Sequence, residues 1–517
     1  MIGLTVLIFA LSGVSYGWQG RMGGMGDPYG LVADESDFLI HPAKIAKGEG
    51  VRFFGDYRFL YTGVLDWDSE VDVFSPGGVL SAVFPKETSG DEQRHEVLVG
   101  SSFPLGPGRM GFFFTYAGMR GDYDGKQREE LYPGPAYYYD TYELNSDLDN
   151  FSFRLLYGLP VGGFKLGGEV QIVYRQEENK ALFNVDAGIN RWLYTNYPWG
   201  GIAGLVAGAD TFPFLLPYDS RYWEALFKGS IEGKVGPLDL EFTLRVGLPF
   251  GGENQYEYER QVPIGTPVDS FRLNGDVQGW RIGGDVWARY PLAEDLSLPF
   301  LVRIDYQTKT RDGDGAGLLG LAGDNFAYKS QEQGLHLEIG GGLDKELSKG
   351  AKIAGGLYYN YLQGNNALQI TDYPAGGGWT NNDSSDFPAS IEHQVMLRLA
   401  GELELSPAVT LRMGLAPFLG WARQDFKFSQ LTSALTGYTD DVSTDGYHWG
   451  IGASLGGTIK FKPITLEPFV NFGYQQLHLK GDGDRVNSPG GLDSLYEMSK
   501  DRDEWSIGGG LSVLFDL

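Results

Sequence analysis

The feature that most constrains the fold is a strict alternation of apolar and polar residues that recurs from Val51 to the end of the chain. In the run 164–175 every charged residue falls on an odd position, and the runs 51–62, 238–248, 335–344 and 395–405 separate their charges similarly. Successive side chains of a strand point to opposite faces, so the pattern predicts strands with one apolar face. A Lys or Arg at the lipid midplane costs roughly 2–4 kcal/mol, so this separation favours strands that cross a bilayer.

The connections between these runs alternate between short turns and long polar loops. Short links occur at 104–109, 160–163, 235–237, 291–296, 346–350, 406–408 and 462–464. This rhythm predicts strands centred near positions 56, 98, 115, 154, 170, 229, 243, 285, 303, 338, 356, 398, 415, 454, 470 and 511. We therefore expect an all-β chain, a transmembrane antiparallel β-barrel of about 16 strands with short periplasmic turns and long extracellular loops.

Aromatic residues gather at the expected strand ends, as a bilayer interface selects. The outer ends carry Tyr61, Tyr116, Tyr174, Trp223, Trp280, Tyr306, Tyr361, Trp421, Trp449, Tyr474 and Trp505. The same register predicts that Phe53, Phe114, Val170, Leu244, Ile339, Leu397 and Val513 face lipid.

The final stretch, 504–517, keeps its apolar alternation up to the last residue, Leu517. It resembles the terminal strand of bacterial outer-membrane barrels, although members of that group usually end in Phe or Trp. The resemblance implies a location in the bacterial outer membrane, closure of the barrel by the first strand, and recognition by the barrel assembly machinery.

The chain begins with an apolar run, Ile2 to Leu11, followed by the small residues Ser15 and Gly17. Residues 1–17 are therefore interpreted as a signal peptide, with a buried first strand as the alternative. The basic residues that usually precede such a run are missing, which leads to the hypothesis of a start codon further upstream.

Residues 18–50 are rich in turn formers and lack alternation. Their Gly-rich stretch and Pro-Ala pair resemble the N-terminal segment of the long-chain fatty-acid outer-membrane transporter family, with matching residues Gly23, Gly24, Gly26, Ala33, Asp34, Pro42 and Ala43. His41 stands where that family has Asn. The resemblance implies a plug inside the barrel, and the alternative is a periplasmic lead-in to the barrel at 51–517.

Composition removes several classes of function. The 517 residues include no Cys, which excludes disulfides, thiolate metal sites and attached c-type haem, and the formal net charge of -26 argues against a nucleic-acid partner. The chain has six His, but no GxSxG motif stands in a strand-to-helix setting, so we do not expect an enzyme, and we expect no cofactor. We expect no metal site either, because the aspartates near 312 and 482 lack the spacing of an EF-hand.

Two groups of charged residues are candidates for function. The predicted pore-lining residues are Arg52, Arg58, Arg154, Glu169, Arg175, Arg245, Arg281, Asp285, Arg303, Asp305, Glu338 and Arg398. Such charges either shape the field felt by a solute or fill the lumen wall with salt bridges. The predicted acidic rim, placed in the long loops, is Asp66, Asp68, Glu70, Asp72, Asp312, Asp314, Asp482 and Asp484.

The longest predicted connection, 176–221, has an apolar centre in which Asp210 is the one charge between positions 200 and 217. Such a segment is costly on a wet surface, so it is expected to fold into the barrel, to cover it, or to form a contact in a homo-oligomer or with a partner.

The sequence leaves three functions open. The first is an outer-membrane channel for passive diffusion of ions and small solutes, mildly cation-preferring because of the acidic rim. The second, implied by the resemblance at 23–43, is a transporter of hydrophobic solutes with an N-terminal plug. The third is a barrel sheath around a partner such as an outer-membrane cytochrome. The expected partners are outer-membrane lipid, the transported solutes or ions, and a second copy of the chain.

Overall fold

The structure is a computed structural model that describes residues 25, 31, 35–74, 80–131, 137–186, 191–192, 205–206, 211–215, 218–261, 267–317, 325–373, 381–433, 436–487 and 494–517. The predicted signal peptide, 1–17, lies outside the described residues. Within them, two short 3-10 helices precede the first strand: η1 (Glu35–Leu39) and η2 (Pro42–Lys47). Neither helix is long or apolar enough to cross a bilayer.

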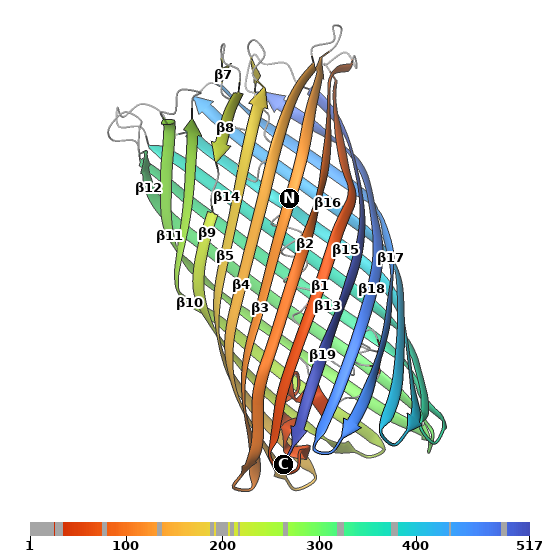
Figure 1. The fold of residues 1–517 in the computed structure, drawn as a ribbon. Helices are drawn as coiled ribbons and strands as arrows, with labels where there is room; N and C mark the ends of the chain where they lie inside the picture. Colours follow the sequence, from red (N-terminus) through yellow and green to blue (C-terminus); the bar gives the residue numbers. More distant parts are fainter. Residues whose placement is uncertain are drawn as a thin grey trace.

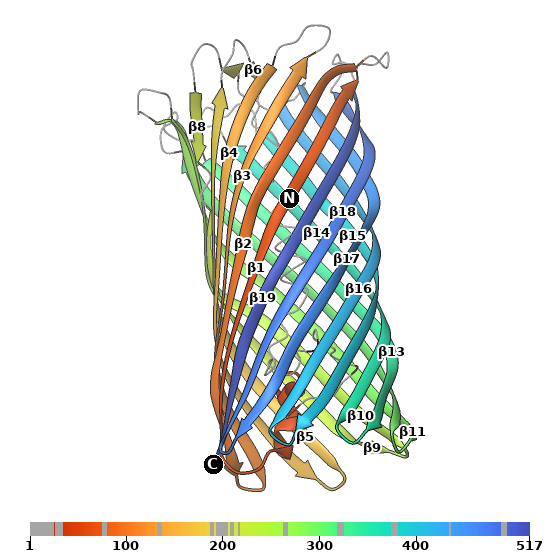
Figure 2. The same cartoon turned by 45° about the vertical axis from the view of Figure 1, so that its right-hand side comes forward.

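A closed antiparallel barrel follows these helices (Figures 1 and 2). Its strands are β1 (Arg52–Phe74), β2 (Leu80–Leu105), β3 (Gly108–Leu131), β4 (Tyr137–Val161), β5 (Phe164–Asp186), β8 (Thr211–Leu215), β9 (Tyr218–Val235), β10 (Leu238–Gln261), β11 (Pro267–Ala293), β12 (Leu296–Gly317), β13 (Asn325–Ser348), β14 (Ala351–Tyr373), β15 (Asn381–Ser406), β16 (Val409–Ser433), β17 (Thr436–Phe461), β18 (Ile464–Asn487) and β19 (Ser494–Asp516). The barrel closes where β1 pairs with β19, from Arg52 opposite Asp516 to Phe74 opposite Leu495.

The predicted strand order is confirmed, and each of the predicted centres falls inside a strand. The short strand β8 and the long strand β9 lie between the same two neighbours, β5 and β10, and so share one place in the wall. The remaining pair, β6 (Arg191–Trp192) and β7 (Leu205–Val206), forms a separate small sheet. Counting β8 and β9 as one strand position, the described part of the barrel has about 16 strands around its circumference, as expected for an outer-membrane barrel.

The long strands run well beyond the alternating stretches from which they were predicted. They contain 18 to 27 residues, whereas about 9–11 residues of a tilted strand cross a bilayer. In the outer half of the barrel both faces of a strand meet water or polar side chains, so apolar alternation fades although the hydrogen-bonded pairing continues. Much of what was predicted as long loop is therefore barrel wall.

The pairing of β10 with β11 contains one of the irregularities of the described wall. β10 and β11 pair at Gly247 opposite Arg281 and again at Asn254 opposite Gly275, and the register shifts between these points. Gly251 lies in this interval with a φ of 57°, a backbone conformation that glycine adopts without steric cost. The interval is thus a bulge in the pairing of the two strands.

The exterior of the barrel carries a continuous apolar band. The residues predicted to face lipid are confirmed on this face: six are exposed, and Val513 is half-buried on the same face as exposed Leu511. The band begins at the short turns, where Leu405 and Phe461 are about 60% exposed. It ends in paired aromatic rings, such as Tyr174 with Trp223 and Trp280 with Tyr306. A water-soluble barrel would not expose this band, and the protein is a bacterial outer-membrane β-barrel.

Candidate functional site

The N-terminal helices lie inside the barrel, near the end that holds the C-terminus (Figures 1 and 2). We call residues 35–47 the lumen segment. Pro42 begins η2, where its missing N–H and fixed φ suit the first helical turn. η2 contacts the inner faces of β3, β4, β5 and β9, and Pro42, Ala43, Lys44 and Ile45 are buried.

The lumen segment is held first by an apolar cluster centred on three phenylalanines. Phe38 of η1 packs against Phe54 of β1 and Phe113 of β3, with ring centroids 5.4 and 5.3 Å apart. Leu39 and Ile45 of the segment join Leu98 and Leu156 of the wall in the same cluster. The alternation along a strand predicts which side chains face the lumen. The apolar side chains at those positions form a water-free surface on which the lumen segment packs.

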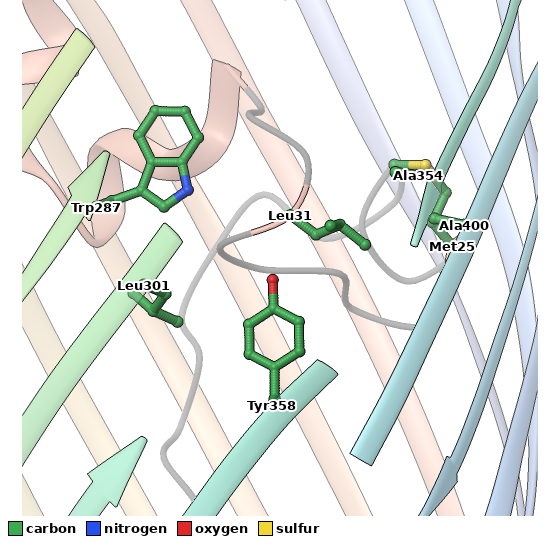
Figure 3. Packing of buried hydrophobic residues seen from close by; sticks show 7 residues of the cluster. All are labelled: Met25, Leu31, Trp287, Leu301, Ala354, Tyr358 and Ala400. Atoms are coloured by element: carbon green, nitrogen blue, oxygen red, sulfur yellow. The ribbon is translucent and has the colours of Figure 1, made fainter. Parts of the chain in front are cut away.

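A second apolar cluster lies where β11 to β15 face the lumen (Figure 3). Its wall residues are Trp287, Leu301, Ala354, Tyr358 and Ala400. The described residues Met25 and Leu31 of the N-terminal region complete the cluster, and Ile40 of the lumen segment packs against it. The inner wall is therefore apolar at two separate places that the N-terminal region covers.

The wall comes close to the lumen segment at positions without a side chain. A Cβ on Gly167 of β5 would overlap the backbone of Pro42 and Ala43, and a Cβ on Gly414 of β16 would overlap the backbone of Met25. Glycine at these inward positions lets two backbones touch. The fit indicates that the wall is shaped for the N-terminal region.

Hydrogen bonds from β9 and β10 fix the lumen segment further. The Ala43 amide donates to Ser230 Oγ at 2.7 Å, and Lys228 Nζ donates to the Leu39 carbonyl at 2.9 Å. His41 Nδ1 is hydrogen-bonded to Thr243 Oγ1. His41 thus replaces the family's Asn with a ring that still finds a polar partner.

Ion pairs concentrate on Lys44 and His41. Lys44 Nζ lies 2.7 Å from Asp37 and 2.9 Å from Glu241, and all three side chains are buried. Burial alone would lower the pKa of Lys44, but Asp37 and Glu241 raise it above its ordinary value. His41 Nε2 lies 3.5 Å from Glu241 and 3.4 Å from Asp285. Burial, followed by the charge of Lys44, holds the pKa of His41 well below its ordinary value, so the ring is neutral at pH 7.

The twelve predicted pore-lining residues all lie on inward-facing positions of their strands, and the structure joins them into ion pairs rather than leaving them in an open tube. Arg154 pairs with Glu169 at 3.1 Å, and both side chains are fully buried. Arg245 bridges Asp285 at 2.9 Å and Asp305 at 2.7 Å. The other pairs are Arg398 and Arg303 with Glu338, Arg281 with Asp305, Arg175 with Glu224, Arg52 with Asp516 and Arg58 with Glu96.

The predicted acidic rim lies elsewhere than expected. All eight residues are in strands, with Asp66, Asp68, Glu70 and Asp72 in β1, Asp312 and Asp314 in β12, and Asp482 and Asp484 in β18. Their assignment to loops is wrong. Asp312, Asp482 and Asp484 are exposed and share a face with lipid-exposed residues of the same strands, because the register is unbroken between them. These three carboxylates point away from the lumen.

The apolar stretch at 200–217 lies largely outside the described residues. Its described parts are β7 and β8, and β8 pairs with β5 and β10 as part of the wall. Whether the rest folds inward or forms a contact stays a prediction. Among the described residues no group of three or more His, Asp or Glu is placed to hold a metal ion.

The sequence did not reveal Lys44, Asp37 and Thr243 as site residues. A lysine in a segment resembling a plug is the one signal that was available, because a buried ammonium requires a carboxylate on the facing wall. The alternation predicts that Glu241 faces the lumen, but it does not indicate which charged residue of the N-terminal region pairs with it.

No protein-family model and no curated protein matches the chain. Among solved structures, the chain is similar to a Pseudomonas aeruginosa FadL homologue, at 12% identity over 96% of this chain and 98% of that chain, with a TM-score of 0.41. It is also similar to the Pseudomonas putida toluene transporter TodX, at 11% identity over 97% and 98%, with a TM-score of 0.41. A third similar structure is the CymD monoaromatic hydrocarbon channel, at 12% identity over 96% and 97%, with a TM-score of 0.33.

Proposed function

We propose that the protein transports hydrophobic solutes across the outer membrane and that the lumen segment is its plug. The observation that carries the proposal is the pair of apolar clusters on the inner wall, each covered by the N-terminal region. A tube for ions and water has no use for buried Phe, Trp and Leu on its lumen face, because a pore wall that conducts ions is polar. An apolar solute that takes the place of the plug finds a dry surface already formed.

The paired lumen charges also favour this function over passive ion diffusion. Arg154, Arg245 and Glu338 are each compensated by wall partners, so they add little net field along the axis. The exposed carboxylates of β12 and β18 point outward, which removes part of the argument for a cation-selective mouth. A mild cation preference remains a proposal for the barrel once the plug has left. The sheath function has no support of its own in the described residues.

The test uses cells whose outer membrane carries the protein. Uptake of N-phenylnaphthylamine, an apolar fluorescent probe that an intact outer leaflet excludes, should rise above that of cells without the protein. Uptake of a charged solute of similar size should stay unchanged. Equal uptake of the apolar probe in both strains would refute the proposal.

A second measurement separates a plugged barrel from an open channel. In planar bilayers the intact protein should show few conductance steps, whereas a variant lacking residues 35–47 should conduct steadily. Steady conductance from the intact protein would instead support the passive channel.

A further inference from the structure

An inward-facing row of side chains crosses five neighbouring strands at one level of the barrel. Glu241 of β10 lies opposite Trp287 of β11, which lies opposite Leu301 of β12. Leu301 lies opposite Gly340 of β13, and Gly340 lies opposite Tyr358 of β14, whose ring covers the glycine. Glu241, Trp287, Leu301 and Tyr358 are all buried. Four strand spacings of about 4.8 Å give the row a length of about 19 Å along the wall. It is acidic at one end and apolar along the rest.

The acidic end has no cation of its own on the wall. In the described part of the chain, the side chains within ion-pair distance of Glu241 are Lys44 and His41, both of the lumen segment, and Lys44 is the charged one because the His41 ring is neutral. The nearby wall cations have other partners: Arg245 pairs with Asp285 and Asp305, and Arg289 pairs with Asp344. Lys228 and Arg303 lie close enough to affect His41, but they pair with Glu169 and Glu338.

A second carboxylate adds negative charge at the acidic end of the row. Glu232 of β9 lies directly opposite Glu241, and like charges at that spacing repel each other. Lys47 of the lumen segment pairs with Glu232 at 2.5 Å, while Lys165 of the wall lies 3.5 Å away. The wall thus presents two carboxylates to the two lysines of η2, and departure of the segment leaves Glu241 without a counter-charge.

Lys44 occupies this end as a ligand would. Its ammonium lies 2.9 Å from Glu241 and 5.1 Å from the centre of the Trp287 ring, the arrangement in which proteins recognise organic cations. Leu31, Ile40 and Met25 of the N-terminal region cover the apolar remainder of the row and the residues next to it. The N-terminal region therefore places an ammonium group next to apolar side chains along this row, as an amphipathic amine would.

The far end of the row holds an unused polar group. The Tyr358 hydroxyl is buried and accepts or donates no hydrogen bond of good geometry within the described residues, although the Arg398 side chain lies close enough to interact with it. Figure 3 shows it directed toward Leu31, into the space that the N-terminal region covers. The guanidinium of Arg398 stacks over the Tyr358 ring at 4.2 Å and is itself paired with Glu338. The hydroxyl therefore keeps hydrogen-bonding capacity for a solute that lies along the row.

We infer that this row is a binding site for amphipathic amines, and that the lumen segment occupies it as an internal mimic. The ammonium of the solute replaces Lys44 between Glu241 and Trp287, and its apolar chain lies along Leu301 toward Tyr358. The inference rests on the proposed function, since it names the solute class that displaces the plug. Binding exchanges one ammonium for another, so the buried carboxylate is never left without a counter-charge.

The experiment follows departure of the segment with a reporter. The chain has no Cys, so Ala43→Cys introduces a single thiol at a buried position of η2. The labelling rate of the full-length protein in lipid vesicles by a water-soluble maleimide is measured with decylamine, decanol and decanoate at equal concentration. Decylamine should raise the rate at least tenfold more than either of the others. Glu241→Gln should remove this advantage, and Glu241→Asp, which keeps the charge, should retain most of it. Glu402→Gln, a lumen carboxylate paired with Arg412, is the matched control and should retain it fully.

The outcomes separate the inference from the proposed function. If decanol accelerates labelling as strongly as decylamine, or if the decylamine advantage survives Glu241→Gln, the amine site is refuted while the transport of hydrophobic solutes stands. If none of the three compounds changes the rate, the plug does not yield to apolar solutes, and the proposed function fails together with the site. A larger response to decanoate would assign the row to anionic solutes and overturn the inference.

Discussion

Removing the ammonium of Lys44 should release the lumen segment. In Lys44→Met the barrel wall keeps Glu241 buried without its partner 2.9 Å away, and Asp37 also loses the ammonium that lies 2.7 Å from it while the segment stays in place. Breaking a buried ion pair costs about 3–5 kcal/mol. Once the segment has left, water solvates both carboxylates, so this cost falls on the plugged state alone. With about 3 kcal/mol, the unplugged population rises roughly 100-fold, since every 1.4 kcal/mol is a factor of ten.

Lys47→Met is the matched control on the same helix. Lys47 also pairs with a wall glutamate, Glu232, but its side chain is 47% exposed, whereas that of Lys44 is 5% exposed. Exposed ion pairs contribute about 0–1 kcal/mol, so this change should alter the unplugged population by less than about fivefold. The double change Lys44→Met with Glu241→Met replaces the pair by apolar groups and should restore much of the retention.

The assay is maleimide labelling of the thiol in Ala43→Cys, carried out in each background. Thermal unfolding of the barrel, followed by circular dichroism, checks that the wall is unchanged, because the pair joins the segment to the wall and lies outside the strand ladder. Equal labelling rates in Lys44→Met and Lys47→Met would refute the reasoning, since it attributes the retention of the segment to the buried pair of Lys44 and assigns little to the exposed pair of Lys47. A double variant that labels as fast as Lys44→Met would show that the effect does not come from the abandoned carboxylate.

Three further changes test other contacts of the site. Gly167→Leu should displace η2 and raise single-channel conductance, whereas Gly168→Leu, on the outward face with open space around it, should change neither. Arg154→Met leaves Glu169 with Lys228 alone, so it should lower the free energy of unfolding of the barrel by about 3 kcal/mol, measured by denaturant titration. Burial depresses the pKa of His41, so the plugged state resists protonation and retention should weaken as pH falls below about 6.5. His41→Asn should flatten that part of the labelling profile.

The barrel could be predicted from the sequence because a bilayer imposes the same requirement on every strand. Phe53, Leu244 and Ile339 must each face lipid, so the same apolar alternation repeats along the chain. That repeat gives the number of strands, their direction and the face of each strand that points to the lumen. The lumen segment obeys no such repeat. The ion pair of Lys44 with Glu241 joins residues far apart in the sequence, and the close approach at Gly167 depends on where the closed wall brings a glycine. These contacts form only when the barrel closes, and the local alternation of residues along the chain carries no information about them.

The acidic stretch at 66–72 shows where a local signal was present and misread. Its carboxylates, Asp66, Asp68, Glu70 and Asp72, fall on every second residue, which is the period of a strand, yet their polarity suggested a loop. In the structure β1 continues through them, with Asp68 opposite Asp501 of β19 and Glu87 of β2. Above the bilayer a strand needs no apolar face, because water solvates a carboxylate on the outside of the wall as well as it does at a pore mouth. The net charge of -26 gives only the sign of the surplus, and the alternation along each strand decides which face of the wall carries a given carboxylate. The exposed carboxylates Asp482 and Asp484 of β18 lie outside, so the charges that face the lumen include the ion pairs of the inner wall and the two lysines of the lumen segment, and not these carboxylates.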